Sequence, residues 1–393
     1  MHMSEWTDDL TADQVLVVDS VSAACAAFPD TYWSEHEQEH SFPDEFFKSM
    51  ADLGIVGMLI PEQYGGGGAS LVDAALALQT VAATGAGLNG CSAIHLSMFG
   101  FHPVVRHGTE DLKERYLPRV AAGDIHIAFG VTEPDAGIDT GRVSTMAVRD
   151  GDRWRIDGRK VWMTKAGFSQ AALVLARTEP VEQTRRPIDG LTLFVADLDP
   201  AHVEARPISK MGRNAVASYE VVFDGLPVPA ANVVGEVGRG FHALLDGLNP
   251  ERVLVAAESI GIGRAAVERA VKYASERIVF GVPIGKHQAV AHPLADAYVQ
   301  LLAANLVMLD AARRYDEGRQ CALQANAAKF LGARAGFFAA DRAVQTHGGY
   351  GYATEYTVER LFREVRLTRI APIPEEMIMN YVSEHVLGLP RSY

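Results

Sequence analysis

Residues 129–139 read FGVTEPDAGID, a polar loop between an amphipathic helical segment and a long run with strand-like alternation. Pro134 removes one backbone donor, and Gly137 permits a backbone approach that a side chain would block. The rest of the loop leaves several N–H groups and the Thr132 hydroxyl without regular pairing, which suits a flat, hydrogen-bonding ring system. Turn-rich loops of this composition more often only connect two elements, so this stretch alone leaves both interpretations open.

A second stretch, residues 158–164, reads GRKVWMT. Trp162 and Thr164 lie two positions apart on a predicted strand and are therefore expected on one face of it. A face that carries a large aromatic plane and a hydroxyl can stack on a ring and bond its edge. The alternative is a Trp in the core of a sheet, which is the commoner place for a lone Trp.

In this order, the two stretches resemble the flavin-binding signatures of the acyl-CoA dehydrogenase family. Residues 276–281 with 287–288, residues 345–351 and residues 359–364 extend the resemblance. In that family the first segment reaches the flavin of a neighbouring subunit, and the second is a glycine turn against the cofactor's diphosphate. The resemblance implies FAD as cofactor and a homo-oligomer, expected to be a tetramer, with shared cofactor sites. The implied FAD contacts are Phe129, Val131, Thr132, Gly137, Trp162, Thr164, Arg277, Phe280, Gln288, Gln345, Gly349 and Glu376.

The fold class expected is α+β, of the acyl-CoA dehydrogenase type. Residues 1–124 have helical patterns and predict an N-terminal α-helical domain. Residues 125–236 have short β-rich runs separated by Asp-Gly turns, which predict a small antiparallel barrel or sandwich. Residues 237–393 return to long amphipathic helices and predict a C-terminal four-helix bundle. Within them, residues 261–266 imitate a dinucleotide fingerprint, but no strand precedes them, so close helix packing is the better interpretation.

Composition limits the partners and the compartment. The formal net charge of −13 disfavours nucleic acid and anionic membrane, so an anionic acyl-CoA would need local Arg or Lys clusters. The three cysteines, Cys25, Cys91 and Cys321, lie far apart, without metal spacing or a disulfide framework, which favours a reducing cytoplasm. We expect no metal site, and His95 in its apolar segment is expected to be a packed histidine. Residues 1–10 do not resemble a signal peptide, no apolar run is expected to span a bilayer, and Tyr393 ends no targeting tail.

The resemblance also frames the search for the catalytic base. The family removes an α-proton with a carboxylate while the β-hydride goes to flavin N5, and most members carry the base in a Glu-Gly-Thr segment. Here Pro372, Ile373 and Pro374 stand at those positions, and Pro372 offers neither a carboxylate nor an N–H for the substrate carbonyl. Either the flavin ribityl hydroxyl and another N–H suffice, or the chemistry has changed.

In the isovaleryl and long-chain members the base lies on a long helix, directly before an Arg. Glu251 and Arg252 match that position, so Glu251 is the expected base, and Arg252 and Ile138 are expected at the substrate. The alternative is a first-turn Glu beside Pro250, stabilised by the helix dipole. Lys165 replaces the family's usual Asn; whether its charge meets a phosphate is open.

The expected activity is FAD-dependent dehydrogenation of an acyl-CoA to the 2,3-enoyl-CoA, with an electron-transfer flavoprotein as acceptor. Three alternatives stay open. In these alternatives the chain is a dehydrogenase of carrier-protein-bound acyl groups, a flavin oxidase or monooxygenase on the same fold, or a flavin-lacking partner subunit.

Overall fold

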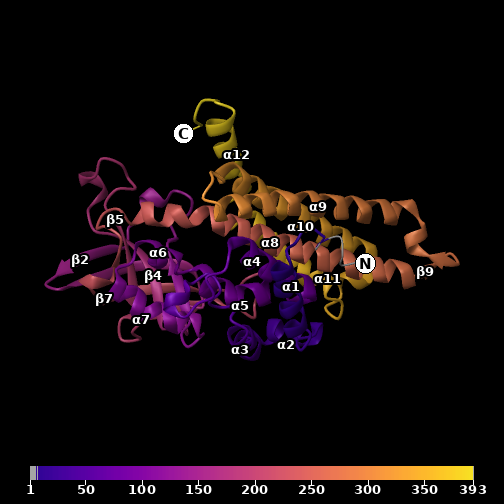
Figure 1. The fold of residues 1–393 in the computed structure, drawn as a ribbon, viewed down its shortest axis with the longest axis horizontal. Coiled ribbons are helices and arrows are strands. Elements are labelled where there is room, and N and C mark those ends of the chain that lie inside the picture. Colours follow the sequence, from indigo (N-terminus) through magenta and orange to yellow (C-terminus); the bar gives the residue numbers. More distant parts are fainter. Residues whose placement is uncertain (1–5, 7, 393) are drawn as a thin grey trace.

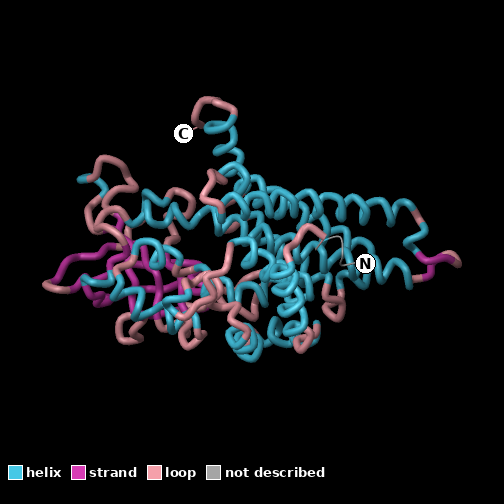
Figure 2. Tube along the Cα trace, in the orientation of Figure 1, coloured by secondary structure: helices cyan, strands magenta, loops and turns pink. Residues whose placement is uncertain are grey.

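The computed structural model describes residue 6 and residues 8–392. The molecule is elongated, with a β sheet at one end and a long helical body that extends from it (Figure 1). Strands gather at that one end, apart from a small hairpin at the opposite tip (Figure 2). The expectations about the two chain ends concern in part residues 1–5, 7 and 393, which lie outside the described residues.

The N-terminal part is helical, and side-chain caps mark several helix starts. Thr11 and Ser70 each cap a helix and complete a capping box with Gln14 and Asp73. Gly85 and Gly87, both at positive φ, lie at the π-turn η3 (Ala82–Ala86) between the two most buried helices. The helices are α1 (Ala12–Cys25), α2 (Asp30–Glu39), α3 (Asp44–Asp52), α4 (Leu71–Val81), α5 (Gly87–Phe99), α6 (His102–His107) and α7 (Glu110–Ala121).

The sheet has the strand order β6-β7-β3-β2-β4-β5-β8, and β1 also pairs with β4. Most pairs are antiparallel, but β1 and β2 each pair with β4 in parallel, which the sequence pattern did not indicate. β4 is buried at every residue because hydrophobic clusters cover both of its faces. The strands are β1 (Ile127–Gly130), β2 (Met146–Asp150), β3 (Arg153–Thr164), β4 (Ala171–Arg177), β5 (Leu191–Asp197), β6 (Val203–Pro207), β7 (Ser218–Pro229) and β8 (Val233–Val234).

The C-terminal part packs three long helices together. α8 continues through Pro250, so Glu251 lies well inside the helix and not in its first turn. A Cβ at Gly261 would lie 2.4 Å from the Gln79 carbonyl oxygen, and one at Gly263 would lie 2.5 Å from Leu301, so these glycines serve close packing. The elements are α8 (Gly240–Glu276), β9 (Ile278–Val279), β10 (Val282–Pro283), α9 (Gln288–Asp316), α10 (Ala322–His347), α11 (Val358–Val365) and α12 (Glu375–Tyr381).

Two helical stretches correct the expectation that no apolar run is long enough for a bilayer. Residues Leu71–His107 and Gln288–Asp316 both meet the length and composition criteria for a membrane span. The first stretch has 83% of its most apolar window buried inside the protein, as the core helices of a soluble protein do. The second is α9, which packs against α8 and α10.

Candidate active site

The loop after β1 is fixed by a buried ion pair. Glu133 Oε1 lies 2.8 Å from the Lys160 ammonium, and its Oε2 accepts hydrogen bonds from the Ser144 backbone and hydroxyl at 2.8 and 2.7 Å. Burial opposes the charge on Glu133, but Lys160 and these donors outweigh it and lower the pKa of Glu133 to about 2. Lys160 also donates to the Val131 carbonyl, so the pair joins the two signature stretches.

Trp162 is on the surface, so the sheet-core interpretation of this residue is wrong. Its side chain is 55% exposed and its backbone adopts a φ of 64°, next to a register shift in β3. The Val161 N–H donates to the Thr132 carbonyl at 2.9 Å, which brings the loop beside the indole. The Thr132 hydroxyl and N–H make no hydrogen bond within the described part of the chain, and the space in front of Gly137 is open. An exposed aromatic plane beside unused donors fits a flavin ring.

Lys165 does not face a phosphate. Its ammonium is fully buried and donates to the Ala93 carbonyl at 3.2 Å and the Ser97 hydroxyl at 3.3 Å, both on α5. The Phe47 ring lies 5.5 Å from the same nitrogen. Burial lowers the pKa of Lys165 to about 7, because no carboxylate within the described residues offsets the lost hydration.

Arg213 connects the end of β3 to α5. Its guanidinium donates to the Thr164 hydroxyl at 3.4 Å, to Ser92 at 3.3 Å and to Ser218 at 2.6 Å. Its Nε is buried and has no hydrogen-bond partner in the described structure. The Arg213 guanidinium is therefore bonded only to neutral hydroxyls in the described structure. One of them belongs to Thr164, which is expected at the flavin edge.

Glu251 meets His95 across the interface between α8 and α5. Its Oε2 lies 2.9 Å from His95 Nε2, and its side chain is 25% exposed. The other ring nitrogen, Nδ1, lies 2.7 Å from Glu258 Oε1, also on α8. Burial alone would lower the pKa of His95, but the two carboxylates outweigh burial and hold it well above its ordinary value.

Glu251 and Thr164 are brought to the same face of α5. Ser92 and His95 lie one helical turn apart on that helix. Ser92 reaches Thr164 through Arg213, and His95 reaches Glu251 directly. The expected base and the strand end that carries the expected flavin contacts are therefore linked through residues one helical turn apart on α5.

The other possible base position holds Pro372, and the adjacent acid Glu375 is engaged by two arginines. Lys329 donates to the carbonyl of Ile373, within the segment where most of the family carries Glu-Gly-Thr. Glu375 is engaged by Arg369 at 2.6 Å and Arg334 at 3.1 Å. Glu376 is exposed at the start of α12.

The two expected substrate residues differ in their surroundings. Arg252 is half-buried and donates to Asn249 at 2.9 Å, while its Nε is buried without a partner in the described structure. Ile138 is 59% exposed, on the open side of the signature loop.

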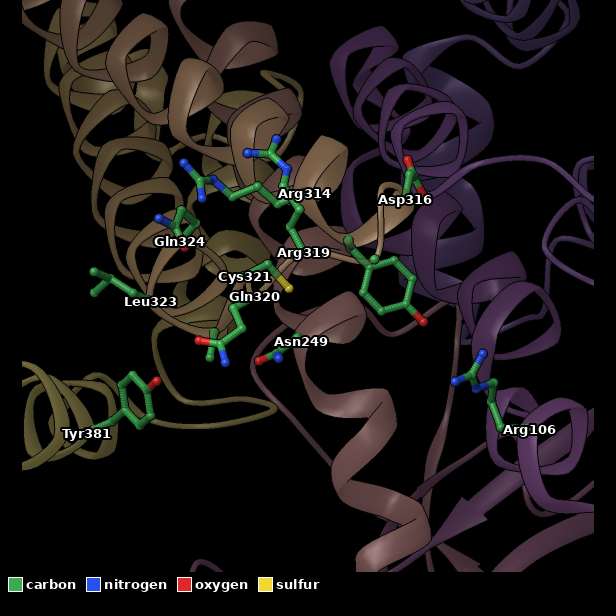
Figure 3. Close-up of a pocket in the computed structure, with 13 residues that line it drawn as sticks. Arg106, Asn249, Arg314, Asp316, Arg319, Gln320, Cys321, Leu323, Gln324 and Tyr381 are labelled. Carbon is green, nitrogen blue, oxygen red and sulfur yellow. The ribbon is translucent and has the colours of Figure 1, made fainter.

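A cavity of about 890 Å³ lies next to this turn of α8 (Figure 3). Arg106 from α6, Arg314 and Arg319 near the end of α9, and Tyr381 from α12 surround Asn249. The Asp316 carboxylate, in the same wall, accepts hydrogen bonds from the backbone N–H groups of Leu71 and Val72. The lining thus contains three arginines, of which Arg314 pairs with Asp310 at 2.8 Å and Arg319 with Glu317 at 2.5 Å, in a chain whose net charge is −13.

The remaining expected cofactor residues lie elsewhere on the chain. Arg277 and Phe280 belong to the β9–β10 hairpin, and the Phe280 side chain is 95% exposed. Gln288 begins α9 beyond that hairpin. Gln345 and Gly349 flank the end of α10, where the space in front of Gly349 is open. The hairpin lies at the opposite end of the long axis from the sheet that contains β3 (Figure 1). One chain therefore does not bring all the expected FAD contacts together.

Several residues of the site escaped the sequence interpretation. Glu133 and Lys160 were available in principle, since the first signature stretch contains three acidic residues and the second contains two basic ones. His95 was expected to be merely packed, and its bonds to Glu251 and Glu258 arise from the packing of α5 on α8. Within the described residues, no cluster of three or more His, Cys, Asp or Glu side chains is arranged to hold a metal ion, so this trio is a hydrogen-bonded network.

Comparison with known families gives three matches that follow one another along the chain. The acyl-CoA dehydrogenase N-terminal domain matches residues 11–124, the middle domain matches residues 128–226, and the C-terminal domain matches residues 238–387. The domain boundaries that we expect, at residues 124/125 and 236/237, stay predictions.

Individual proteins show the same similarity. Acyl-CoA dehydrogenase FadE12 of Mycobacterium tuberculosis is 37% identical over 95% of this chain and 96% of its own. Caffeyl-CoA reductase-Etf complex subunit CarC of Acetobacterium woodii is 35% identical over 86% of this chain and 88% of its own. A glutaryl-CoA dehydrogenase from Mycobacterium smegmatis, solved in complex with FADH2, superposes with a TM-score of 0.90 at 26% identity, covering 98% of this chain and 97% of that one.

Proposed function

Because the chain belongs to the acyl-CoA dehydrogenase family and is an FAD-dependent oxidoreductase, we propose that it desaturates an acyl-CoA between Cα and Cβ with Glu251 as the base. The observation that carries this proposal is the placement of Glu251. Its carboxylate is largely buried, is bonded to His95, and shares a face of α5 with the link to Thr164. Such a carboxylate is poorly solvated, as a base for a weakly acidic α-proton requires.

The residues of this chain divide the reaction among them. Trp162 and Thr132 would hold the isoalloxazine edge, and FAD, when bound, supplies the acceptor for the hydride that leaves Cβ. Glu251 accepts the α-proton on its carboxylate. Arg213 is the buried cation available to offset the charge that develops on the thioester oxygen, in place of the N–H that Pro372 lacks.

The arginine-lined cavity supports a thioester of an anionic carrier. Three arginines line the cavity around Asn249, which lies two residues before Glu251 on α8, and arginine is a residue type that binds phosphate through paired hydrogen bonds. Because the net charge of the chain is negative, binding of an anionic CoA thioester needs a local group of arginines such as this one. We therefore propose CoA as the carrier. We also propose that the protein is a cytoplasmic homotetramer.

The relative CarC motivates both an acceptor and a second candidate function. Its name places it in an Etf complex, so an electron-transfer flavoprotein is the proposed acceptor. Its name also describes a reductase, so reduction of an enoyl-CoA is the second candidate. The same residues serve both directions, since Glu251 would then return the proton to Cα.

The proposal is tested by anaerobic mixing of the purified holoenzyme with butanoyl-CoA, 3-methylbutanoyl-CoA and octanoyl-CoA, read as loss of flavin absorbance. We expect Glu251→Gln to slow the reduction by at least about a hundredfold with every probe that reduces the parent, because an amide cannot accept the proton. Glu268→Gln, an exposed position on the same helix, is the matched control and should keep the parent rate. Unchanged reduction in Glu251→Gln contradicts the assignment of the base.

A further inference from the structure

His95 has a carboxylate partner on each of its two ring nitrogens. A buried histidine is satisfied by one acceptor or donor per nitrogen, and neutral groups usually serve. Here both nitrogens meet carboxylates, Glu251 at 2.9 Å and Glu258 at 2.7 Å. The two glutamates lie two turns apart on α8 and so face α5 together. Two acids that converge on one buried ring form a charged assembly whose removal from water is costly.

We propose that His95 is the positioning residue of Glu251: it donates one N–H to Glu251 and the other to Glu258, and so holds the base ionised and oriented. The proposal rests on the proposed function, in which Glu251 removes the α-proton. His95 itself touches neither the reacting carbon nor the cofactor.

The hydrogen-bond inventory explains how the ring does this. Ionised carboxylate oxygens only accept, so both ring nitrogens must donate, and the ring is an imidazolium. One oxygen of Glu251, Oε2, is tied to the ring, while Oε1 accepts no hydrogen bond within the described part of the chain. That leaves Oε1 as the atom that receives the α-proton.

Glu258 prevents the imidazolium from weakening the base. A cation beside a carboxylate lowers its pKa, which keeps it ionised but makes it less basic. A second carboxylate on the far nitrogen offsets part of that charge and keeps the ring protonated. The trio carries a formal charge of −1 before the proton transfer and none after it, so a buried charge is removed as the reaction proceeds.

Other charged groups surround this trio from neighbouring elements. Arg213, which precedes β7, and Cys91 on α5 both interact electrostatically with Glu258. Glu364 on α11 interacts with Arg213, and the Lys165 ammonium bonds α5 at Ala93 and Ser97. All of these are kept in the variants below, so a change in pH dependence reports on the trio.

The test follows the rate of anaerobic flavin reduction against pH in the holoenzyme, with whichever of the three acyl-CoA probes reduces the parent fastest. In His95→Gln the amide can still donate to Glu251 but carries no charge, so the acidic limb of the profile should move up by about one pH unit or more. His95→Leu should show the same shift and a rate at least about tenfold lower at neutral pH. Glu258→Gln should move the acidic limb to lower pH, because the imidazolium charge beside Glu251 is then no longer offset.

His126→Gln is the matched control. His126 packs among Phe42, Phe47 and Phe168 and touches no carboxylate within the described residues, so its replacement should leave the acidic limb in place. The inference is overturned if His95→Gln lowers the rate equally at every pH, since a structural role would do that. His95→Gln alone decides the matter if His95→Leu does not fold. If Glu251→Gln is inactive but the acidic limb of His95→Gln stays where it is in the parent, only this inference fails. If Glu251→Gln keeps the parent rate, the proposed function fails as well.

Discussion

At the scale of single residues, Lys165 shows how strongly surroundings change a side chain's behaviour. Its pKa of about 7 in the folded chain compares with 10.5 for an ordinary lysine. Between these two values the unfolded chain binds a proton that the native chain does not, so native stability falls as pH falls from about 10.5 to about 7 and then levels off. Lys165→Met removes this cost and should raise the unfolding free energy relative to the parent. This gain should be about 3 kcal/mol larger at about pH 7 than at about pH 9.5.

Thermal unfolding of parent and variant at the two pH values measures this difference. The variant lacks the interactions of the ammonium with Ala93, Ser97 and Phe47 at both pH values, so the comparison isolates the titration. Lys48→Met, at an exposed lysine, should show no such pH dependence. A gain that is the same at both pH values would mean that Lys165 stays protonated in the native protein.

The sequence could name Lys165 as an unusual residue but not its environment. Its position after Trp162 and Thr164 left open whether its charge meets a phosphate, whereas its positive φ turns the chain and the side chain lies under α5. Glu251 was found by its place before Arg252, while its partner His95 depends on how α5 meets α8. Contacts between distant helices are not encoded in local spacing, and this is why the trio was missed.

At the scale of elements, one ion pair joins the signature loop to β3. Replacing Lys160 by Met leaves the Glu133 carboxylate buried without its cation, which typically costs about 3–5 kcal/mol. We expect Lys160→Met to lower the melting temperature and the FAD content of the purified protein, because the loop that carries Thr132 and Gly137 loses its anchor. Glu133→Gln/Lys160→Met should recover much of both, since no unpaired charge remains. The ratio of flavin to protein absorbance reports the FAD content. If the double variant recovers neither melting temperature nor FAD content, the charge of the pair is not what holds the loop.

Element types were largely predictable, and element pairings were not. The short β-rich runs predicted within residues 125–236 include residues 172–176 and 191–196, which are apolar and bounded by turns and lie in β4 and β5. β1 and β6 were missed: the first lies directly before the signature loop, and the second is mostly exposed and lacks an apolar stripe. The parallel pairing of β1 with β4 joins segments separated by β2 and β3, which no local pattern reveals.

At the scale of the whole molecule, the position of the hairpin makes oligomeric state part of the site. Arg277 and Phe280 lie at the opposite end of the long axis from the sheet that carries Trp162, and the Phe280 ring is 95% exposed (Figure 1). A surface phenylalanine on a hairpin tip loses favourable burial free energy unless another surface covers it. If a second copy of the chain places this hairpin against its partner's flavin, each cofactor site takes Trp162 from one chain and Phe280 from the other.

Complementation between two defective chains tests this arrangement. Trp162→Ala spoils the loop half of the site, and Arg277→Ala/Phe280→Ser spoils the hairpin half, so each variant alone should retain little FAD. In a random mixture of equal amounts, half of the dimers contain both variants, and each of these has one intact site of two, so about a quarter of all sites should hold FAD. Co-expression with two affinity tags isolates the mixed dimers, and flavin absorbance of this doubly tagged species should show FAD in about half of its sites. Mixing the separately purified proteins without subunit exchange is the control and should give no gain. Absence of FAD in the doubly tagged species would show that the hairpin does not complete its neighbour's site.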